Sequence, residues 1–238
     1  MIDFRGWQRT SLLDFPGHVA TVFFTAGCNF RCPMCHNADL VLRPASLPST
    51  SSDEAFQFLR RRAGKVTGVV VTGGEPTLQT GLASFLEAVR GQGYATKLDT
   101  NGYRPDILGA LLDDGLVDMV AMDVKGPPAK YALLSGVADI EVARIARSVA
   151  LLAEAEVHAE LRTTVVPGML DEDDIRSVTQ WLDDITGGSH VSYVLQQFRP
   201  VGTLDPALMK IQPYSGVKLR EIAERASRPG LDISVRGV

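Results

Sequence analysis

All three cysteines of this 238-residue chain fall within eight residues, Cys28-Asn29-Phe30-Arg31-Cys32-Pro33-Met34-Cys35. The spacing Cys-x3-Cys-x2-Cys places the three thiols on one tight loop. A [4Fe–4S] cluster is normally held by four cysteine thiolates, so three would leave one iron open to a ligand from outside the protein. The spacing therefore favours a [4Fe–4S] cluster with one open iron, held by Cys28, Cys32 and Cys35.

Other uses of these thiols have to be weighed against the cluster. Zinc is the main competitor, because His36 follows Cys35 directly and Cys3His is a known tetrahedral ligand set. Structural zinc sites usually take their ligands from two separated pairs, however, and the chain has no second pair. Disulfides are disfavoured by the odd number of cysteines and by their short spacing. A non-catalytic zinc or iron–sulfur module stays open as an alternative.

Composition limits the classes of function. Hydrophobic residues make up 45% of the chain, which is enough for a well-buried core, and a chain of this length suits a single α/β barrel. The net charge of −4 argues against general nucleic-acid binding. The longest apolar run, at 19–26, is too short to span a bilayer, and the N-terminus lacks a signal-peptide pattern. Three thiols in a leaderless chain predict a cytoplasmic protein with no membrane or nucleic-acid partner.

Strand-like and helix-like segments alternate along the chain. After a short strand or hairpin within 1–17, apolar runs predict strands at 19–24, 66–72, 94–99, 117–124, 157–166, 191–198 and 231–235. Helices are predicted from a capping box at Ser51 and Glu54 to about 62, and at 80–91, 105–114, 139–155, 171–185 and 213–226, with a linker at 44–52.

This alternation predicts an α/β fold of parallel βαβ units, a single-domain partial (β/α)6 TIM-like barrel over residues 1–238. In this interpretation residues 1–17 are an N-terminal extension and 199–217 form a mobile loop, which is punctuated by proline and glycine.

Glycine and polar motifs follow the predicted strands at their carboxyl ends, where such barrels place active sites. They are the cysteine loop, Gly73-Gly74-Glu75-Pro76, Asp99-Thr100-Asn101-Gly102, Asp123-x-Lys125, Arg162 with Thr163 and Thr164, and Gln196, Gln197 and Arg199. Each alone has a structural explanation: Gly-Gly-Glu-Pro is a common turn, and Arg162 would suit a buried ion pair with Glu160 or Asp123. His18 and His158 are interpreted as structural, and His190 as a loop residue. Together the six strand ends predict one active site.

Two of these motifs resemble those of the radical S-adenosylmethionine (SAM) enzymes. They are the Cys-x3-Cys-x2-Cys loop after the first long strand and Thr72-Gly73-Gly74-Glu75-Pro76 after the second. The resemblance implies that the amino and carboxylate groups of SAM chelate the open iron. It also implies that reductive cleavage of SAM yields methionine and a 5′-deoxyadenosyl radical, which abstracts hydrogen from a substrate.

The flanking residues resemble one group of that superfamily, the glycyl-radical-enzyme activases. The motifs that carry this resemblance lie at 11–17, 35–37, 99–102, 123–125 and 165–168. The stretch Gln196-Gln197-Phe198-Arg199-Pro200 is most similar to the activating proteins of anaerobic ribonucleoside-triphosphate reductase, since pyruvate formate-lyase activases usually have a His at the position of Arg199. The resemblance implies a glycyl radical enzyme as partner and a flavodoxin or ferredoxin-type electron donor.

The resemblance also implies roles for single residues. It implies that Lys125 and the three cysteines are catalytic residues. Met34 occupies the position where the family usually has an aromatic residue against the adenine, so apolar contact with the adenine is expected there. The resemblance implies that Gly73, Gly74 and Glu75 bind the methionyl amino group of SAM. It implies that Asp99, Asp123 and Lys125 lie along the carboxylate and ribose, where a monovalent cation is a further option. Arg162 and Arg199 would complete the pocket.

A second enzyme class stays open beside the activases, namely a small-molecule radical SAM enzyme such as 7-carboxy-7-deazaguanine synthase. Such enzymes are similarly short, and they typically carry Gln-Gly-Glu-Gly where this chain has Asp14-Phe15-Pro16-Gly17. The activase interpretation therefore ranks first. The chain also lacks the eight-cysteine insert of some activases, so the resemblance implies a single cluster.

Overall fold

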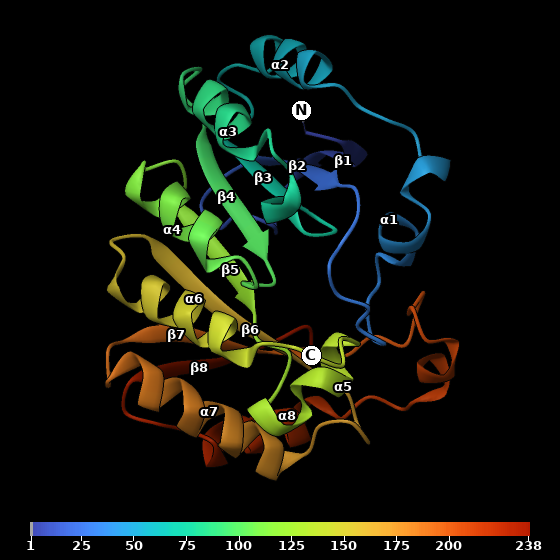
Figure 1. The fold of residues 1–238 in the computed structure, drawn as a ribbon, viewed down its shortest axis with the longest axis vertical. Coiled ribbons are helices and arrows are strands. Elements are labelled where there is room, and N and C mark those ends of the chain that lie inside the picture. Colours follow the sequence, from blue (N-terminus) through green and yellow to red (C-terminus); the bar gives the residue numbers. More distant parts are fainter. Residues whose placement is uncertain (1) are drawn as a thin grey trace. The chain divides into compact units, whose positions relative to one another are not determined.

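The computed structural model describes residues 2–238, and in these residues eight strands form a sheet whose order follows the chain from β1 to β8 (Figure 1). The strands are β1 (Phe4–Ser11), β2 (Ala20–Thr25), β3 (Gly68–Gly73), β4 (Ala95–Thr100), β5 (Met119–Asp123), β6 (His158–Val165), β7 (Val191–Gln197) and β8 (Leu231–Arg236). β1 runs antiparallel to β2, whereas β2–β3, β3–β4, β6–β7 and β7–β8 are parallel pairs. The α/β class is therefore confirmed.

Helices connect the parallel strands. The α-helices are α1 (Ala38–Leu42), α2 (Ser52–Arg61), α3 (Leu82–Arg90), α4 (Pro105–Asp113), α5 (Tyr131–Ser135), α6 (Val142–Glu154), α7 (Glu172–Thr186) and α8 (Gly216–Arg225). Short 3-10 helices occur at η1 (Pro44–Ser46), η2 (Pro76–Leu78), η3 (Pro128–Lys130) and η4 (Pro206–Lys210). The seven predicted strands after residue 17 and the six predicted helices each match an element within three residues, whereas α1, α5 and the 3-10 helices were not predicted.

The contacts along the chain divide it into two compact units, which are described separately. The first unit contains the residues up to Asn29 together with Asp39–Thr100 and Asp106–Ala121. The second unit contains Phe30–Ala38, Asn101–Pro105 and Met122–Val238.

The first unit has its core around β2 and β3. Val69, Val70 and Val71 are fully buried, as expected for a parallel strand that is covered on both faces. Phe4 of β1 packs against Phe23 of β2 with ring centroids 4.9 Å apart, so the two strands of the hairpin are joined by a buried aromatic contact. α3 lies beside β4, and the capping box predicted for α2 is present.

The second unit is built on β6, β7 and β8. α6 and α7 lie side by side along these strands (Figure 1). The Tyr193 hydroxyl on β7 donates to Thr163 Oγ1 on β6 at 2.7 Å, which satisfies two buried polar groups in the core. α7 starts with a capping box at Asp171 and Asp174, and acidic residues fill its first turn, where the helix dipole favours them.

Candidate functional site

In the first unit, the Gly-Gly-Glu turn holds the segment that leads into the cysteine loop. β3 ends at Gly73, whose φ of +112° is a conformation that other residues rarely adopt. The Gly74 N–H donates to the Thr25 carbonyl at 2.9 Å, and the Glu75 N–H donates to the Gly27 carbonyl at 2.8 Å. These two backbone bonds fix the chain just before Cys28.

The carboxylate of Glu75 is buried and hydrogen-bonded inside the same unit. Its side chain caps η2, where Oε1 accepts from the Thr77 N–H at 3.0 Å and from the Thr77 hydroxyl at 2.6 Å. The same oxygen accepts from the Thr100 hydroxyl at 2.7 Å. Glu75 therefore connects the turn after β3 to the end of β4, a structural role that the sequence did not reveal.

Asp99 lies on β4, next to a cation of the same strand. Lys97 Nζ and Asp99 Oδ1 are 2.5 Å apart, and only 4% of the Lys97 side chain is exposed. Residues i and i+2 of a strand share a face, so the short spacing alone brings this pair together. A buried ammonium group needs such a partner, and Asp99 provides it.

In the second unit, the cysteine loop is anchored on α5, which the sequence did not predict. Cys32 and Cys35 flank a turn in which the Cys35 N–H donates to the Cys32 carbonyl at 3.0 Å. The Arg31 N–H donates to the Ser135 carbonyl at 2.7 Å. A Cβ atom on Gly136, which caps α5 with φ +67°, would lie 2.3 Å from the Arg31 carbonyl oxygen. Glycine therefore allows α5 to approach the loop.

The segment after β7 holds the other end of the cysteine loop. The Leu204 N–H donates to the Cys35 carbonyl at 2.9 Å, and the Asp205 N–H donates to the Pro33 carbonyl at 2.9 Å. Residues 199–217 were predicted as a mobile loop, and in the structure they contain η4 and these two anchors.

His36 contacts the carboxyl end of β7. Its Nε2 lies 2.9 Å from the Arg199 carbonyl oxygen, and its ring stacks on Phe198 at a centroid distance of 6.5 Å. A carbonyl oxygen only accepts, so Nε2 is the donor in this contact and cannot also bind a metal ion. This geometry disfavours His36 as an Nε2 ligand to zinc. Arg199 contributes its carbonyl here, and its side chain is exposed.

The three cysteines are thiols that fall in different units. Cys28 belongs to the first unit and is half-buried, whereas the second unit contains the buried Cys32 and the half-buried Cys35. Burial raises the pKa of the Cys32 thiol, and the charge of Lys125 opposes that shift. Met34, between them in the sequence, is also buried. Among residues 2–238, no group of three or more His, Cys, Asp or Glu side chains is gathered closely enough to hold a metal ion.

Asp123, Lys125 and Arg162 form one charged cluster in the second unit. Asp123 Oδ2 lies 2.8 Å from Lys125 Nζ, and Asp123 Oδ1 lies 3.0 Å from Arg162 Nε. Burial alone would raise the pKa of Asp123, but the two cations outweigh it and lower that pKa to about 2. Burial likewise opposes the charge on Lys125, yet Asp123, with a smaller contribution from Cys32, raises the Lys125 pKa above its usual value. The cluster is therefore fully ionised at neutral pH.

The ion pair proposed for Arg162 from the sequence had two candidate partners, Glu160 and Asp123. The structure pairs Arg162 with Asp123, whereas Glu160 forms a two-pronged ion pair with Arg236 on β8, with distances of 2.8 and 2.5 Å. Arg236 is two strands away from Glu160 in the sheet, so no local pattern indicates that contact.

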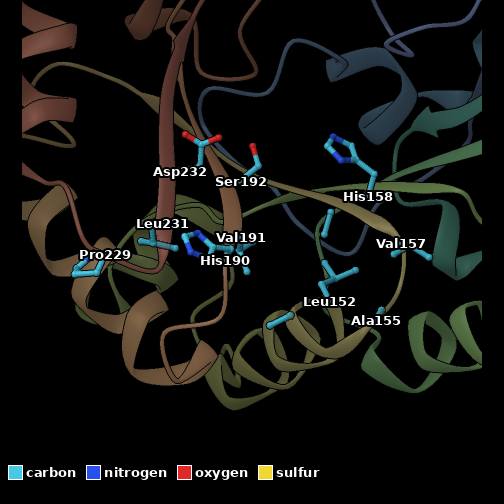
Figure 2. Close-up of a pocket in the computed structure, with 12 residues that line it drawn as sticks. Leu152, Ala155, Val157, His158, His190, Val191, Ser192, Pro229, Leu231 and Asp232 are labelled. Carbon is cyan, nitrogen blue, oxygen red and sulfur yellow. The ribbon is translucent and has the colours of Figure 1, made fainter.

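A cavity of about 570 Å³ lies elsewhere in the second unit, at the amino ends of β6, β7 and β8 (Figure 2). Its polar lining includes His158, His190, Ser192 and Asp232, and Figure 2 shows these side chains on neighbouring segments around it. Active sites of parallel βαβ barrels form at the carboxyl ends of the strands, where Arg199 follows β7. This cavity is therefore separate from the predicted site.

No helix in the described part of the chain is both long and apolar enough to cross a membrane.

Comparison with known proteins agrees with this organisation. Residues 22–180 match the model of the Radical SAM superfamily. A Methanocaldococcus jannaschii protein provisionally named glycyl-radical enzyme activating enzyme is 31% identical over 225 residues, which cover 92% of this chain and 89% of that protein. The pyruvate formate-lyase 1-activating enzyme of Escherichia coli is 31% identical over 178 residues, or 71% of this chain and 70% of that enzyme. Streptococcus suis SuiB, solved bound to S-adenosylmethionine, shares the fold with a TM-score of 0.68 and 15% identity over 91% of this chain and 49% of that chain.

Proposed function

Since this chain belongs to the radical SAM superfamily and, within it, to the glycyl-radical-enzyme activating enzymes, we propose that its partner is anaerobic (class III) ribonucleoside-triphosphate reductase. The family implies a [4Fe–4S] cluster and SAM as cofactors. The observation that carries the choice of partner is the stretch from Gln196 to Pro200 at the end of β7, with Arg199 where pyruvate formate-lyase activases usually have a His.

The three free thiols of the cysteine loop are the type of donor that such a cluster needs. Cys28 follows a backbone segment that Gly74 and Glu75 fix, and Cys35 is held through its carbonyl by Leu204. We assign Cys28, Cys32 and Cys35 as the cluster ligands. These three residues would hold the cluster, and the cluster with bound SAM would supply a 5′-deoxyadenosyl radical for abstraction of a hydrogen atom from the partner.

The charged cluster of the second unit suits the polar end of SAM. SAM carries a carboxylate, an ammonium group and a sulfonium, so its binding site needs cations and carboxylates in separate places. Asp123 stays ionised, and Lys125 and Arg162 hold two positive charges beside it. We assign these three residues, together with Arg199 and with Asp99 of the first unit, to the carboxylate and ribose of SAM. A monovalent cation is proposed to bind in the same region.

Two further contacts complete the proposed SAM site. We assign Gly73, Gly74 and Glu75 to the methionyl amino group. Two backbone hydrogen bonds hold their turn against the chain before Cys28, so these residues are fixed next to the first cysteine. Met34 provides apolar contact for the adenine, consistent with its burial beside the two cysteines of the second unit.

Residues 5–15 and 199–217 are proposed to contact the glycyl radical enzyme. Leu12 and Leu13 are adjacent and have exposed fractions of 72% and 91%, and Val201 has an exposed fraction of 72%. Adjacent exposed leucines are unusual on a surface that meets only water, so they favour a protein contact. We propose that 199–217 moves to admit the glycine-bearing loop, that a flavodoxin or ferredoxin-type protein donates the electron, and that the reaction occurs in the cytoplasm.

The experiment that tests this function starts with anaerobic reconstitution of the chain with iron and sulfide. We expect one oxygen-sensitive [4Fe–4S] cluster per chain and, with dithionite, conversion of SAM to 5′-deoxyadenosine and methionine. Replacing Cys28, Cys32 or Cys35 with Ala should abolish both cluster and cleavage. Stoichiometric zinc without labile sulfide, in protein purified without oxygen, would contradict the assignment of the thiols. Turnover of a pterin substrate would instead favour the deazaguanine synthase class.

A further inference from the structure

A groove of about 480 Å³ lies in the first unit, between β1 and α2. Two β1 residues, Trp7 and Arg9, share one face of the strand because they are two positions apart. α2 and the residue after it contribute positions on one helical face. The lining residues are Trp7, Arg9, Glu54, Phe58, Arg61 and Arg62.

The groove carries an excess of positive charge. It contains three guanidinium groups and one carboxylate, and that carboxylate, on Glu54, accepts from the Ser51 N–H and hydroxyl, which hold the pKa of Glu54 below its usual value. In the described part of the chain, none of Arg9, Arg61 and Arg62 forms an ion pair, and the buried Nε of Arg62 has no hydrogen-bond partner. This local positive charge contrasts with the net charge of −4 of the chain.

The aromatic rings of the groove are already in contact with other groups. Trp7 stacks on Phe23 with centroids 5.2 Å apart, and the Arg9 guanidinium lies 4.8 Å from the Trp7 centroid. Phe58 meets Trp7 edge-on at 4.9 Å and has the Arg62 guanidinium 5.8 Å from its centroid. The groove therefore offers guanidinium groups rather than open ring faces, which disfavours a stacked nucleobase as its ligand.

The strand that forms one wall of the groove is an edge strand. β1 is the first strand in the order of the sheet, and its Phe4 pairs with Thr25 of β2. On its other side Phe4 forms an antiparallel bridge with Thr50, whose N–H donates to the Phe4 carbonyl at 2.9 Å. That edge therefore already pairs with one extended residue. Among residues 2–238, the outer edge of β1 forms no further bridge along residues 6–11. Edges of this kind can accept an added strand.

We propose that this groove binds an extended acidic segment of a partner protein, which pairs with β1 as an added strand. Alternate Asp or Glu side chains of that segment would face Arg9, Arg61 and Arg62, so the charges specify the ligand and the strand edge specifies its conformation. The proposal concerns binding only and does not depend on the cofactors or the radical chemistry.

The test uses fluorescence anisotropy with the full chain and a labelled octapeptide of alternating Glu and Thr. We expect this peptide to bind at least tenfold more tightly than the matched peptide of alternating Gln and Thr. Arg9→Gln and Arg61→Gln should each weaken binding about threefold, as expected for exposed ion pairs. Both residues are exposed, so the folding of these variants should be preserved, which circular dichroism checks. The matched control is Arg60→Gln, which removes an exposed charge from α2 outside the groove and should leave binding unchanged.

Strand pairing is tested with two further versions of the Glu peptide. One is N-methylated at every odd-numbered residue and the other at every even-numbered residue. Only the peptide whose methylated amides face β1 should lose binding, because a methylated amide cannot donate to the strand edge. Equal affinity of both methylated peptides for the chain would overturn the added strand. Three results would overturn the acidic ligand. The first is equal binding of the Glu and Gln peptides, and the second is an equal effect of Arg60→Gln and Arg61→Gln. The third is tighter binding of a single-stranded oligonucleotide than of the Glu peptide.

Discussion

A Cβ atom on Gly74 would lie 1.7 Å from the carbonyl oxygen of Gly27. No side chain fits at that distance, so the turn after β3 and the segment before Cys28 are in contact through backbone alone. In the same contact the Glu75 N–H donates to the Gly27 carbonyl. The glycine is therefore required by the structure in addition to any contact with SAM.

Gly74→Ala should displace the segment that carries Cys28. We expect it to lower the free energy of unfolding by about 1–3 kcal/mol, as overpacking typically does, and to lower the iron bound per chain after reconstitution. Urea unfolding and iron analysis measure the two effects. Gly91→Ala is the matched control, because Gly91 has φ −60° and its nearest potential contact is 3.4 Å away. Normal iron content in Gly74→Ala would contradict the role of this contact in positioning the loop.

Asp123→Ala should weaken SAM binding while leaving the cluster in place. The substitution removes a carboxylate that accepts from both Lys125 and Arg162, and it takes one negative charge out of the proposed pocket. We expect the dissociation constant for SAM to rise about tenfold or more, as for the loss of a charged hydrogen bond. Isothermal titration with the reconstituted protein measures it, and visible absorbance reports the cluster.

The control for Asp123 is Asp173→Ala, which removes an exposed carboxylate from the first turn of α7 that pairs with Arg176. It should change neither SAM affinity nor cluster absorbance. If Asp123→Ala instead loses the cluster, Asp123 has a structural role and its assignment to SAM is wrong.

Asp118 should make stability depend on pH in the acidic range. Burial would raise its pKa, but hydrogen bonds from Arg90 and from the Thr96 N–H outweigh burial and lower it. A carboxylate with a lowered pKa in the folded state contributes stability above its unfolded pKa of about 3.9, and this contribution is lost as the pH falls through the folded value.

In the metal-free chain, Asp118→Asn should therefore lower the free energy of unfolding by about 0.5–1 kcal/mol at pH 7, since the pair is partly exposed. The difference from the unaltered chain should shrink as the pH is lowered from 5 toward 3, which urea unfolding at several pH values measures. A difference that stays constant over this range would show that the effect is not due to ionisation of Asp118.

Local patterns in the sequence were sufficient to predict most of the fold. The run Val69 to Val71 predicted a buried parallel strand, and Ser51 with Glu54 predicted the start of α2, because both signals lie within a few residues. α1 and α5 were missed since each is only five residues long, too short to show an amphipathic period.

The contacts of the site were predicted less well than its residues. Asp99 and Asp123 are predicted from their places at strand ends, and their partners Lys97 and Lys125 lie only two residues away in the sequence, so local spacing is sufficient for these two pairs. The anchoring of Cys35 by Leu204 joins residues far apart in the sequence. Such pairings depend on how strands and loops are placed in space, which no local pattern encodes.

We propose that this chain places a radical on a glycine of its partner. The most direct measurement is electron paramagnetic resonance of the reconstituted protein mixed anaerobically with a class III ribonucleoside-triphosphate reductase, SAM and reductant. We predict the doublet of a glycyl radical, split by its α-hydrogen, which collapses to a singlet when the glycine of the reductase is deuterated at the α-carbon. SAM cleavage without any glycyl signal from the reductase would contradict the proposed partner.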